Sequence, residues 1–481
     1  MSLHPPSFIQ LGSEFFERTE PTPVRQPELL LFNEAWAKAN LAPESLPSSA
    51  LELAKVFCGN QTLPGSEPIA CAYAGHQFGH YNPRLGDGRA HLLGELKGLD
   101  GSDWEVQLKG SGITDFSRGG DGRCALAPAL REYLMSEAMY ALGVPTGRCL
   151  AVVSTGETVY RQGAEPGAIV TRLMASHLRV GSFQYAANQL GPEATKRLLD
   201  YAIARHYPHI DPNDAQAPLL FLQAVAEKQR QLIKAWMRVG FIHGVMNTDN
   251  CAISGDTIDY GPCAMLGTFD LNQVYSSIDQ QGRYAFGRQP HIAQWNLARL
   301  TETLLPLMPG EKQEVLAKLQ DFVDGLGESF ERDFGEVLAQ KLGLSDADKH
   351  QELIATLVER MQQQGLDYTQ TFDRLTESQQ DSSLLAPLQA VLGDWLPLWH
   401  EALASEPNGA YQLMRAANPR VIPRNHWVEA VLEAAVEHGD LAPFKRFLKV
   451  LQQPYQQLDE TSDFQSAKPE YDLSYQTFCG T

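Results

Sequence analysis

Two polar segments, HGVMNTDN at 243–250 and DYGP at 259–262, carry the side chains best suited to metal chemistry. Asn250 and Asp259 offer side-chain oxygens, the hard ligands with which Mg²⁺ or Mn²⁺ is held together with phosphate groups. A turn rich in Asn and Asp between apolar strands is the alternative interpretation of the same residues. We predict that Asn250 and Asp259 hold a metal that is bound to ATP.

The order of these residues follows the catalytic loop of protein kinases, H-R-D-x-x-x-x-N, and the D-F-G motif that comes after it. His243 matches the histidine, Asn250 the asparagine and Asp259 the D-F-G aspartate. The catalytic aspartate, however, is replaced by Val245, whose side chain cannot accept a proton. Asp249, directly before Asn250, is the carboxylate that could act as the base instead.

Upstream residues could bind the phosphates of the nucleotide. Gly86 and Gly88 in LGDGRAHLLGEL would let backbone N–H groups approach phosphates, although a plain hairpin turn explains the same glycines. Lys109 ends the strand-like VQLK, and Glu132 follows 23 residues later on an expected helix. This separation is compatible with the lysine–glutamate pair that positions ATP in kinases.

Two further features extend the phosphate-binding prediction. The segment SRGGDGR places Asp121 and Gly122 in a second Gly-rich turn. Arg172 and Arg179 could bind phosphate oxygens through their guanidinium groups, although an isolated arginine is more often a surface residue.

The elements that must position these residues indicate two lobes. β-like runs occur at 90–96, 104–110, 150–155 and 168–173, with one helix at 126–143 between them, and helical periodicity dominates from about 190 to 450. This order predicts an α+β, bilobal protein-kinase-like fold with a β-rich N-lobe, a helical C-lobe and a C-terminal helical extension. The expected parts are an N-terminal extension (1–69), the N-lobe with the nucleotide loops (70–185), the C-lobe with the metal and catalytic loop (186–330), the helical extension (331–452) and a polar, tethered or partly disordered tail with Cys479 (453–481).

Composition argues against several classes of protein. The formal net charge of −19 argues against a nucleic-acid partner, which needs a broad basic surface. No apolar run approaches the length of about 20 residues that spans a bilayer, so no membrane association is expected. The seven cysteines are scattered and form no CxxC pair, which is typical of a reduced, cytoplasmic protein.

Taken together, the motifs resemble the selenoprotein O family of kinase-fold protein adenylyltransferases. The likeness runs from about residue 20 to 450. The matching motifs are GHQFG (75–79), LGDGR (85–89), LKGSG (108–112), SRGGDGR (117–123), SEAM (136–139), RLMASHLR (172–179), HGVMNTDN, DYGP and QGRYAF (281–286).

The resemblance implies that ATP binds in the reverse of its kinase orientation, with the α-phosphate facing the acceptor. AMP then passes to a Ser, Thr or Tyr hydroxyl of a protein, with this chain itself among the candidate acceptors, and pyrophosphate leaves. The resemblance also implies roles for individual residues, with Asp249 as the proton acceptor, Asn250 and Asp259 as metal ligands, and the nucleotide bound by Gly86, Gly88, Arg89, Lys109, Asp121, Gly122, Glu132, Arg172, Arg179 and Asp259.

Three alternatives remain open at this point. They are transfer of UMP with Mn²⁺, phosphoryl transfer, which Val245 disfavours, and a pseudokinase scaffold that binds nucleotide without turnover.

Members of the family also carry a selenocysteine or cysteine near the C-terminus, and Cys479 matches it. The position aligned with their second redox cysteine is Tyr275, so we expect no disulfide between Cys263 and Cys479.

Overall fold

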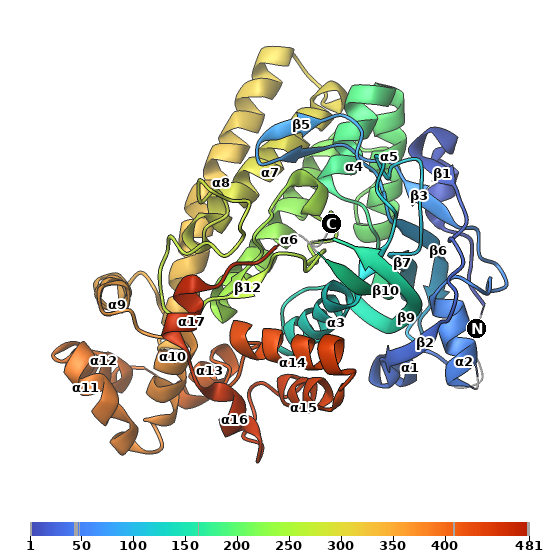
Figure 1. The fold of residues 1–481 in the computed structure, drawn as a ribbon. Coiled ribbons are helices and arrows are strands. Elements are labelled where there is room, and N and C mark those ends of the chain that lie inside the picture. The colour runs from blue at the N-terminus through green and yellow to red at the C-terminus, as the bar shows by residue number, and fades with distance from the viewer. Residues whose placement is uncertain (1, 43–46, 48, 162, 407–408, 479–481) are drawn as a thin grey trace.

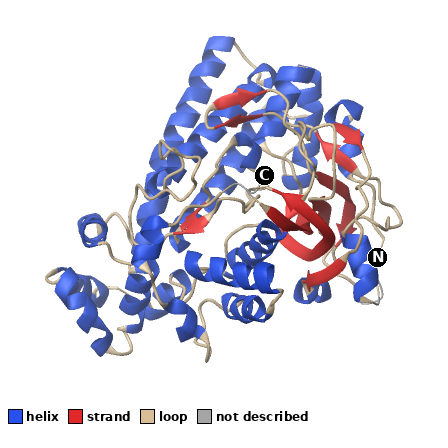
Figure 2. Cartoon of the chain, in the orientation of Figure 1, coloured by secondary structure: helices blue, strands red, loops and turns tan. Residues whose placement is uncertain are grey.

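The computed structural model describes residues 2–42, 47, 49–161, 163–406 and 409–478. The runs expected at 90–96, 150–155 and 168–173 lie within strands, and the run expected at 104–110 is a strand as far as Lys109. The helix expected at 126–143 forms over most of its length. The chain is mixed α/β, with a β-rich N-terminal part and a helical C-terminal part, as the order of the sequence patterns predicted (Figure 1 and Figure 2).

The N-terminal part is built on an antiparallel sheet with the strand order β1-β3-β6-β7-β10-β9-β2, and β8 pairs with β10. Lys109 on β7 lies opposite Val170 on β10, and Gln107 lies opposite Arg172. Because residues two apart on a strand share a face, this register places Lys109 and Arg172 on the same face of the sheet. The bounds are β1 (Phe16–Arg18), β2 (Glu28–Phe32), β3 (Ile69–Cys71), β6 (Ala90–Lys97), β7 (Asp103–Lys109), β8 (Cys124–Ala125), β9 (Arg148–Tyr160) and β10 (Ala164–Met174).

One helix, α3 (Leu126–Ala141), packs against β9 and β10 and covers this sheet. It ends just before Gly143, whose positive φ of 74° is the left-handed conformation that commonly terminates helices. Glu132, which the sequence placed on this helix, is only 4% exposed. The helix therefore carries a carboxylate into the interior, towards the sheet.

In the helical part, α6 (Ala217–Val239) packs against α7 and α8, and Gly240 caps it in the left-handed conformation. Two short two-stranded sheets accompany these helices. One is the hairpin of β4 (Gly75–Gln77) and β5 (His80–Asn82), and the other pairs β11 (Phe241–Ile242) with β12 (Ala264–Met265). The other helices are α1 (Glu34–Asn40), α2 (Ala50–Phe57), α4 (Val180–Tyr185), α5 (Pro192–His206), α7 (Gln289–Leu304), α8 (Lys312–Lys341), α9 (Gln351–Gln364), α10 (Tyr368–Glu377), α11 (Ala386–Leu392), α12 (Trp395–Ala404), α13 (Ala410–Ala417), α14 (Asn425–His438), α15 (Ala442–Leu451), α16 (Thr461–Gln465) and α17 (Pro469–Ser474).

The polar tail is tethered as far as the structure describes it. It contains α16 and α17, and the Thr477 N–H donates to the Tyr275 carbonyl at 2.7 Å while the Ser277 N–H donates to the Thr477 carbonyl at 3.0 Å. Cys263 is buried, and Cys479 lies outside the described residues, so the expectation about their disulfide stays a prediction.

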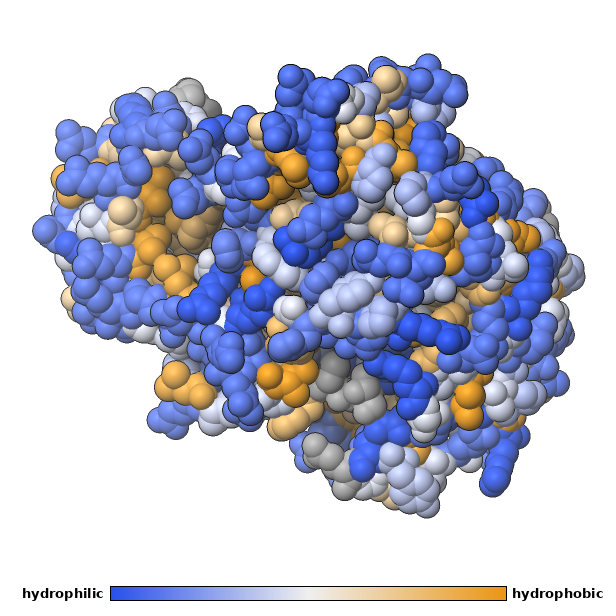
Figure 3. Space-filling model, turned by 90° about the horizontal axis from the view of Figure 1, so that it is seen from above, coloured by the Kyte–Doolittle hydropathy of each residue, from blue (hydrophilic) through white to orange (hydrophobic). Residues whose placement is uncertain are grey.

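The surface seen from above in Figure 3 is mainly hydrophilic, with hydrophobic side chains in scattered patches. Among the described residues, none of the helices combines the length and apolar composition needed to cross a membrane.

Candidate active site

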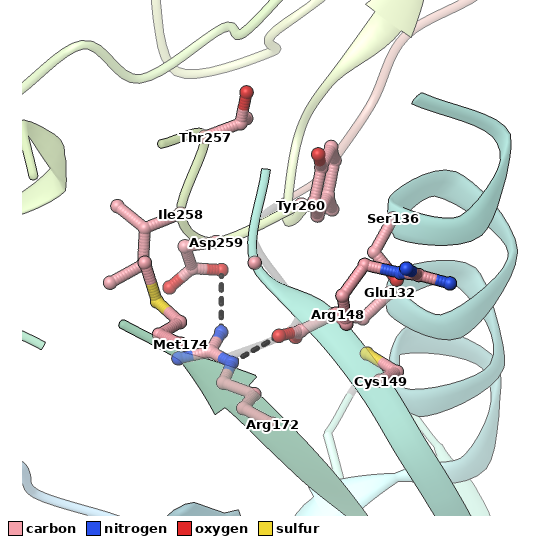
Figure 4. A pocket seen from close by; sticks show the side chains of 11 residues that line it. Glu132, Ser136, Arg148, Cys149, Arg172, Met174, Thr257, Ile258, Asp259 and Tyr260 are labelled. Carbon is pink, nitrogen blue, oxygen red and sulfur yellow. Dashed lines mark hydrogen bonds and ion pairs between the residues drawn. The ribbon is translucent and has the colours of Figure 1, made fainter. Parts of the chain in front are cut away.

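Four charged side chains from three separate regions meet between the sheet, α3 and the DYGP segment. The Lys109 ammonium lies 2.8 Å from Glu132 Oε2 and 3.0 Å from Asp259 Oδ1. The Arg172 guanidinium donates to Glu132 and lies 3.4 Å from Asp259 Oδ1, and Figure 4 shows both contacts. The structure thus joins four of the predicted site residues in one ion-pair cluster.

The cluster carries more positive than negative charge. Burial raises the pKa of Asp259, but the opposing attraction of Lys109, Arg172 and Arg89 is larger and holds that pKa well below its usual range. Burial also raises the pKa of Glu132, but the attraction of Arg172 and Lys109 is larger, so the pKa of Glu132 is lowered. Three cations therefore face two ionised carboxylates, an arrangement that favours a polyanion such as a polyphosphate.

The backbone around Asp259 is held in an uncommon conformation. Asp259 has φ of 66°, in the left-handed region that few non-glycine residues adopt. The neighbouring Ile258 carbonyl accepts a hydrogen bond from His243 Nε2 at 3.0 Å, and His243 Nδ1 accepts one from the Val245 N–H at 3.3 Å. Burial lowers the pKa of His243, so a neutral imidazole links the two polar segments.

Asp249 is a buried carboxylate with one oxygen unused. Its Oδ2 accepts a hydrogen bond from the Gln77 amide at 3.2 Å, and its carbonyl accepts one from Arg179 at 3.2 Å. Within the described residues, Oδ1 has no hydrogen-bond partner. Burial raises the pKa of Asp249 to about 6, so the group is suited to accepting a proton near neutral pH.

The oxygens expected to bind metal are available for coordination. The Asn250 amide nitrogen donates to the Val245 carbonyl at 3.1 Å, and no hydrogen bond among the described residues engages Asn250 Oδ1 or Asp259 Oδ2. The described residues contain no group of three His, Cys, Asp or Glu placed to hold a metal ion. One amide and one carboxylate oxygen fit Mg²⁺ or Mn²⁺ only as a partial shell, which phosphate oxygens and water would complete.

The loop before β6 is fixed by Phe116 and does not form the plain hairpin turn considered from the sequence. It connects β5 to β6, which do not pair with each other. A Cβ on Gly86 would lie 2.2 Å from the Phe116 ring, and one on Gly88 would lie 2.5 Å from the Phe116 carbonyl oxygen. Glycine is required at both positions because Phe116 occupies the space that a side chain would take.

Two of the predicted residues lie apart from the ion-pair cluster. Asp121 forms a bidentate ion pair with Arg161, with N–O distances of 2.9 and 3.0 Å. In the described part of the chain, no contact joins Asp121 to Lys109. Gly122 has φ of 68° and packs on the backbone of Gly112, which a Cβ would approach to 2.2 Å.

Sequence reasoning gave no role to the β4–β5 hairpin, which holds the loop of Asp249. The His76 N–H donates to the Thr248 hydroxyl at 2.7 Å, and the Gln77 amide reaches Asp249. The first strand and the turn of the hairpin form GHQFG, which the sequence analysis used only as one motif of a resemblance. Its partners are about 170 residues away in the chain, so no local pattern could have indicated them.

A family model described as Protein adenylyltransferase SelO matches residues 2–452. The chain belongs to this family. Proteins named protein nucleotidyltransferase YdiU are similar over almost the whole length. The one from Pseudoalteromonas translucida is 50% identical over 480 residues, covering 99% of each chain, and the one from Teredinibacter turnerae is 47% identical with the same coverage. The relative from Geobacillus kaustophilus is 48% identical over 481 residues, covering 99% of this chain and 98% of that one. This SelO-family chain is therefore a nucleotidyltransferase, which implies a nucleotide substrate.

Proposed function

We propose that this SelO-family enzyme transfers AMP from ATP to Ser, Thr or Tyr hydroxyls of proteins, within a bilobal kinase-like fold that binds ATP in the reverse orientation. The observation that carries the proposal is the position of the carboxylate in the HGVMNTDN segment. Val245 stands where a kinase has its base, while Asp249 is buried beside Asn250 with a free carboxylate oxygen.

The kinase-like fold is supported by the placement of the charged residues. The Lys109–Glu132 pair links a strand of the sheet to the helix that covers it, and Asp259 meets this pair from the helical part. The same three groups, in this order, position ATP and its metal in kinases.

The proposed roles rest on these contacts together with the family resemblance. Arg172 and Arg179 bind the phosphates that lie deepest, and Lys109 binds a phosphate while Glu132 orients it. Gly86, Gly88, Arg89, Asp121 and Gly122 line the nucleotide site, and Asn250 and Asp259 hold the metal. When bound, Mg²⁺ or Mn²⁺ would neutralise phosphate charge and orient the phosphate oxygens.

In the proposed reaction, Asp249 removes the proton from the acceptor hydroxyl as its oxygen attacks the α-phosphorus of ATP. The bond from the α-phosphorus to the bridging oxygen breaks, and pyrophosphate leaves with the bonding electrons. AMP remains on the acceptor as a phosphodiester.

The six cysteines that the structure describes are all free and buried, which supports a cytoplasmic location.

The test compares ATP labelled at the α-phosphate with ATP labelled at the γ-phosphate. We expect protein labelling, including self-labelling, only from the α-label, and we expect Asp259→Ala and Asp249→Asn to abolish it. Labelling from the γ-phosphate alone would indicate a phosphotransferase instead. A panel of ATP and UTP with each metal separates AMP from UMP transfer, and nucleotide binding without any labelling would indicate a scaffold.

A further inference from the structure

Two arginines stack on one tryptophan beside the β4–β5 hairpin. The guanidinium carbons of Arg283 and Arg299 lie 4.8 and 5.0 Å from the ring centroid of Trp295. We refer to these three residues as the Trp295 cluster. The indole ring is perpendicular to the ring of His76 on β4, with a centroid distance of 5.2 Å and an interplanar angle of 87°.

The Trp295 cluster is connected to the loop that carries the proposed base. Gln77, the residue after His76, donates to the carboxylate of Asp249. On the other side, Tyr284 follows Arg283 and donates through its hydroxyl to Asn247 Oδ1 at 2.7 Å. A molecule bound by the cluster would therefore lie next to the position where the acceptor hydroxyl must enter.

The positive charge of the Trp295 cluster is poorly neutralised within the protein. In the described residues, no carboxylate lies within 4.0 Å of the Arg283 guanidinium, and the only acid that pairs with Arg299 is Glu302, whose side chain is 59% exposed. The Nε atoms of Arg283 and Arg299 are buried and lack hydrogen-bond partners. Burial and the field of the two arginines together lower the pKa of His76, against a hydrogen bond from Gln184 that raises it.

The guanidinium groups of Arg283 and Arg299 are suited to binding a carboxylate. A guanidinium forms short, charge-assisted hydrogen bonds to carboxylate oxygens, and stacking on an aromatic ring fixes its orientation beforehand. The adjacent hairpin presents exposed residues, including Tyr81 at 38% exposure, and the face towards which β5 lies in Figure 1 is mainly hydrophilic in Figure 3. A polar segment could therefore lie against this surface, whereas a large apolar partner would not match it.

We propose that the Trp295 cluster binds acidic residues of the acceptor protein, close in sequence to the hydroxyl that receives AMP. This inference rests on the proposed function, since it gives that site its substrate preference. The phosphates of the nucleotide have their own cations in Lys109, Arg172 and Arg179, which leaves Arg283 and Arg299 for the acceptor. An acidic acceptor would be recognised here even though the chain as a whole carries a net charge of −19.

Binding of a peptide to the full chain tests the proposal without turnover. The probe is a short fluorescein-labelled peptide with a single tyrosine flanked by glutamates, and the matched peptide has glutamines in their place. We expect fluorescence anisotropy to show that the acidic peptide binds about tenfold more tightly, with the preference falling as salt is added. Arg283→Gln should remove most of that preference, and Arg283→Lys should retain part of it.

The control variant is Arg332→Gln, which removes an equal charge from an exposed position on α8 and should leave the preference unchanged. Equal binding of both peptides, or equal weakening of both by Arg283→Gln, would overturn the proposal and leave the cluster a structural role. A parallel assay with α-labelled ATP keeps the two proposals distinct. Charge-dependent binding without any transfer would contradict the proposed function alone, whereas transfer to both peptides with equal efficiency would contradict the acidic docking site alone.

Discussion

Replacement of Glu132 by glutamine tests the ion-pair cluster most directly. The change keeps the shape of the side chain but removes its charge, and it leaves Lys109 and Arg172 with Asp259 as their shared acid. Both cations stay buried, at 6% and 8% exposure, so water cannot replace the lost carboxylate. We expect Glu132→Gln to destabilise the fold and to misplace Lys109.

The size of the effect follows from the geometry. At the 2.8 Å separation of Lys109 and Glu132, the attraction between two unit charges is about 6 kcal/mol for an effective dielectric constant of about 20. The glutamine oxygen still accepts a hydrogen bond, and Asp259 remains at 3.0 Å. The expected fall in the free energy of unfolding is therefore about 3 kcal/mol, the lower end of the range for breaking a buried pair. The transfer rate should fall about 100-fold, as expected when a positioning group is displaced by about 1 Å.

The assay combines urea unfolding, followed by tryptophan fluorescence, with transfer from α-labelled ATP. The matched control is Glu137→Gln on the same helix, where Arg148 binds the carboxylate at 2.8 and 2.6 Å outside the cluster. We expect similar destabilisation from the control but no loss of transfer. Equal loss of transfer in both variants, or a destabilisation by Glu132→Gln below about 1 kcal/mol, the range of an exposed pair, would refute the reasoning.

Three further predictions concern single positions. Gly86→Ala should lower the free energy of unfolding by about 3 kcal/mol, because the left-handed backbone strains alanine and its Cβ would lie 2.2 Å from Phe116. Gly119 is also left-handed, but no atom lies within 4 Å of an added Cβ, so Gly119→Ala should lower the free energy of unfolding by only about 1 kcal/mol in the same urea titration. Gln77→Leu should reduce kcat for transfer about tenfold with unchanged ATP affinity, because Asp249 loses the hydrogen bond from its side-chain donor; unchanged kcat would contradict this. Burial raises the pKa of Asp472 to about 6, above the unfolded value of about 3.9, so its contribution to stability is full below about pH 4 and is lost as the pH rises through about 6. Between about pH 4 and pH 6, the free energy of unfolding should therefore fall by about 2 to 3 kcal/mol less in Asp472→Asn than in the unmodified protein. Urea unfolding at each pH measures this difference.

Local patterns predicted the strands and helices that carry the site. Lys109 ends a strand and Glu132 lies on a helix because β-type runs and apolar periodicity are written in neighbouring residues. The burial of Glu132 was not predicted, since a periodicity count treats any glutamate as a residue of the polar face. The cost of its burial is offset by Lys109 and Arg172, which come from two different strands and become neighbours only in the folded sheet.

Contacts between distant segments account for what the sequence could not indicate. The turn at Gly86 was open to interpretation as a hairpin because the ring that packs on it, Phe116, lies 30 residues further along the chain. Gln77 and Asp249 are 172 residues apart, and a hydrogen bond of this kind has no periodicity to reveal it. The stacking of Arg283 on Trp295 is likewise a product of the fold.

The positions of β1 and β2 in the sheet have a consequence for aggregation. These strands are neighbours in sequence, yet β1 lies on one edge of the sheet and β2 on the other. One short stretch of chain therefore forms both edges of the sheet, and its strands offer only three and five residues for pairing with another molecule. Any species in which this stretch has detached would present two open edges at once. Association between molecules should accordingly begin there, before the rest of the fold is lost.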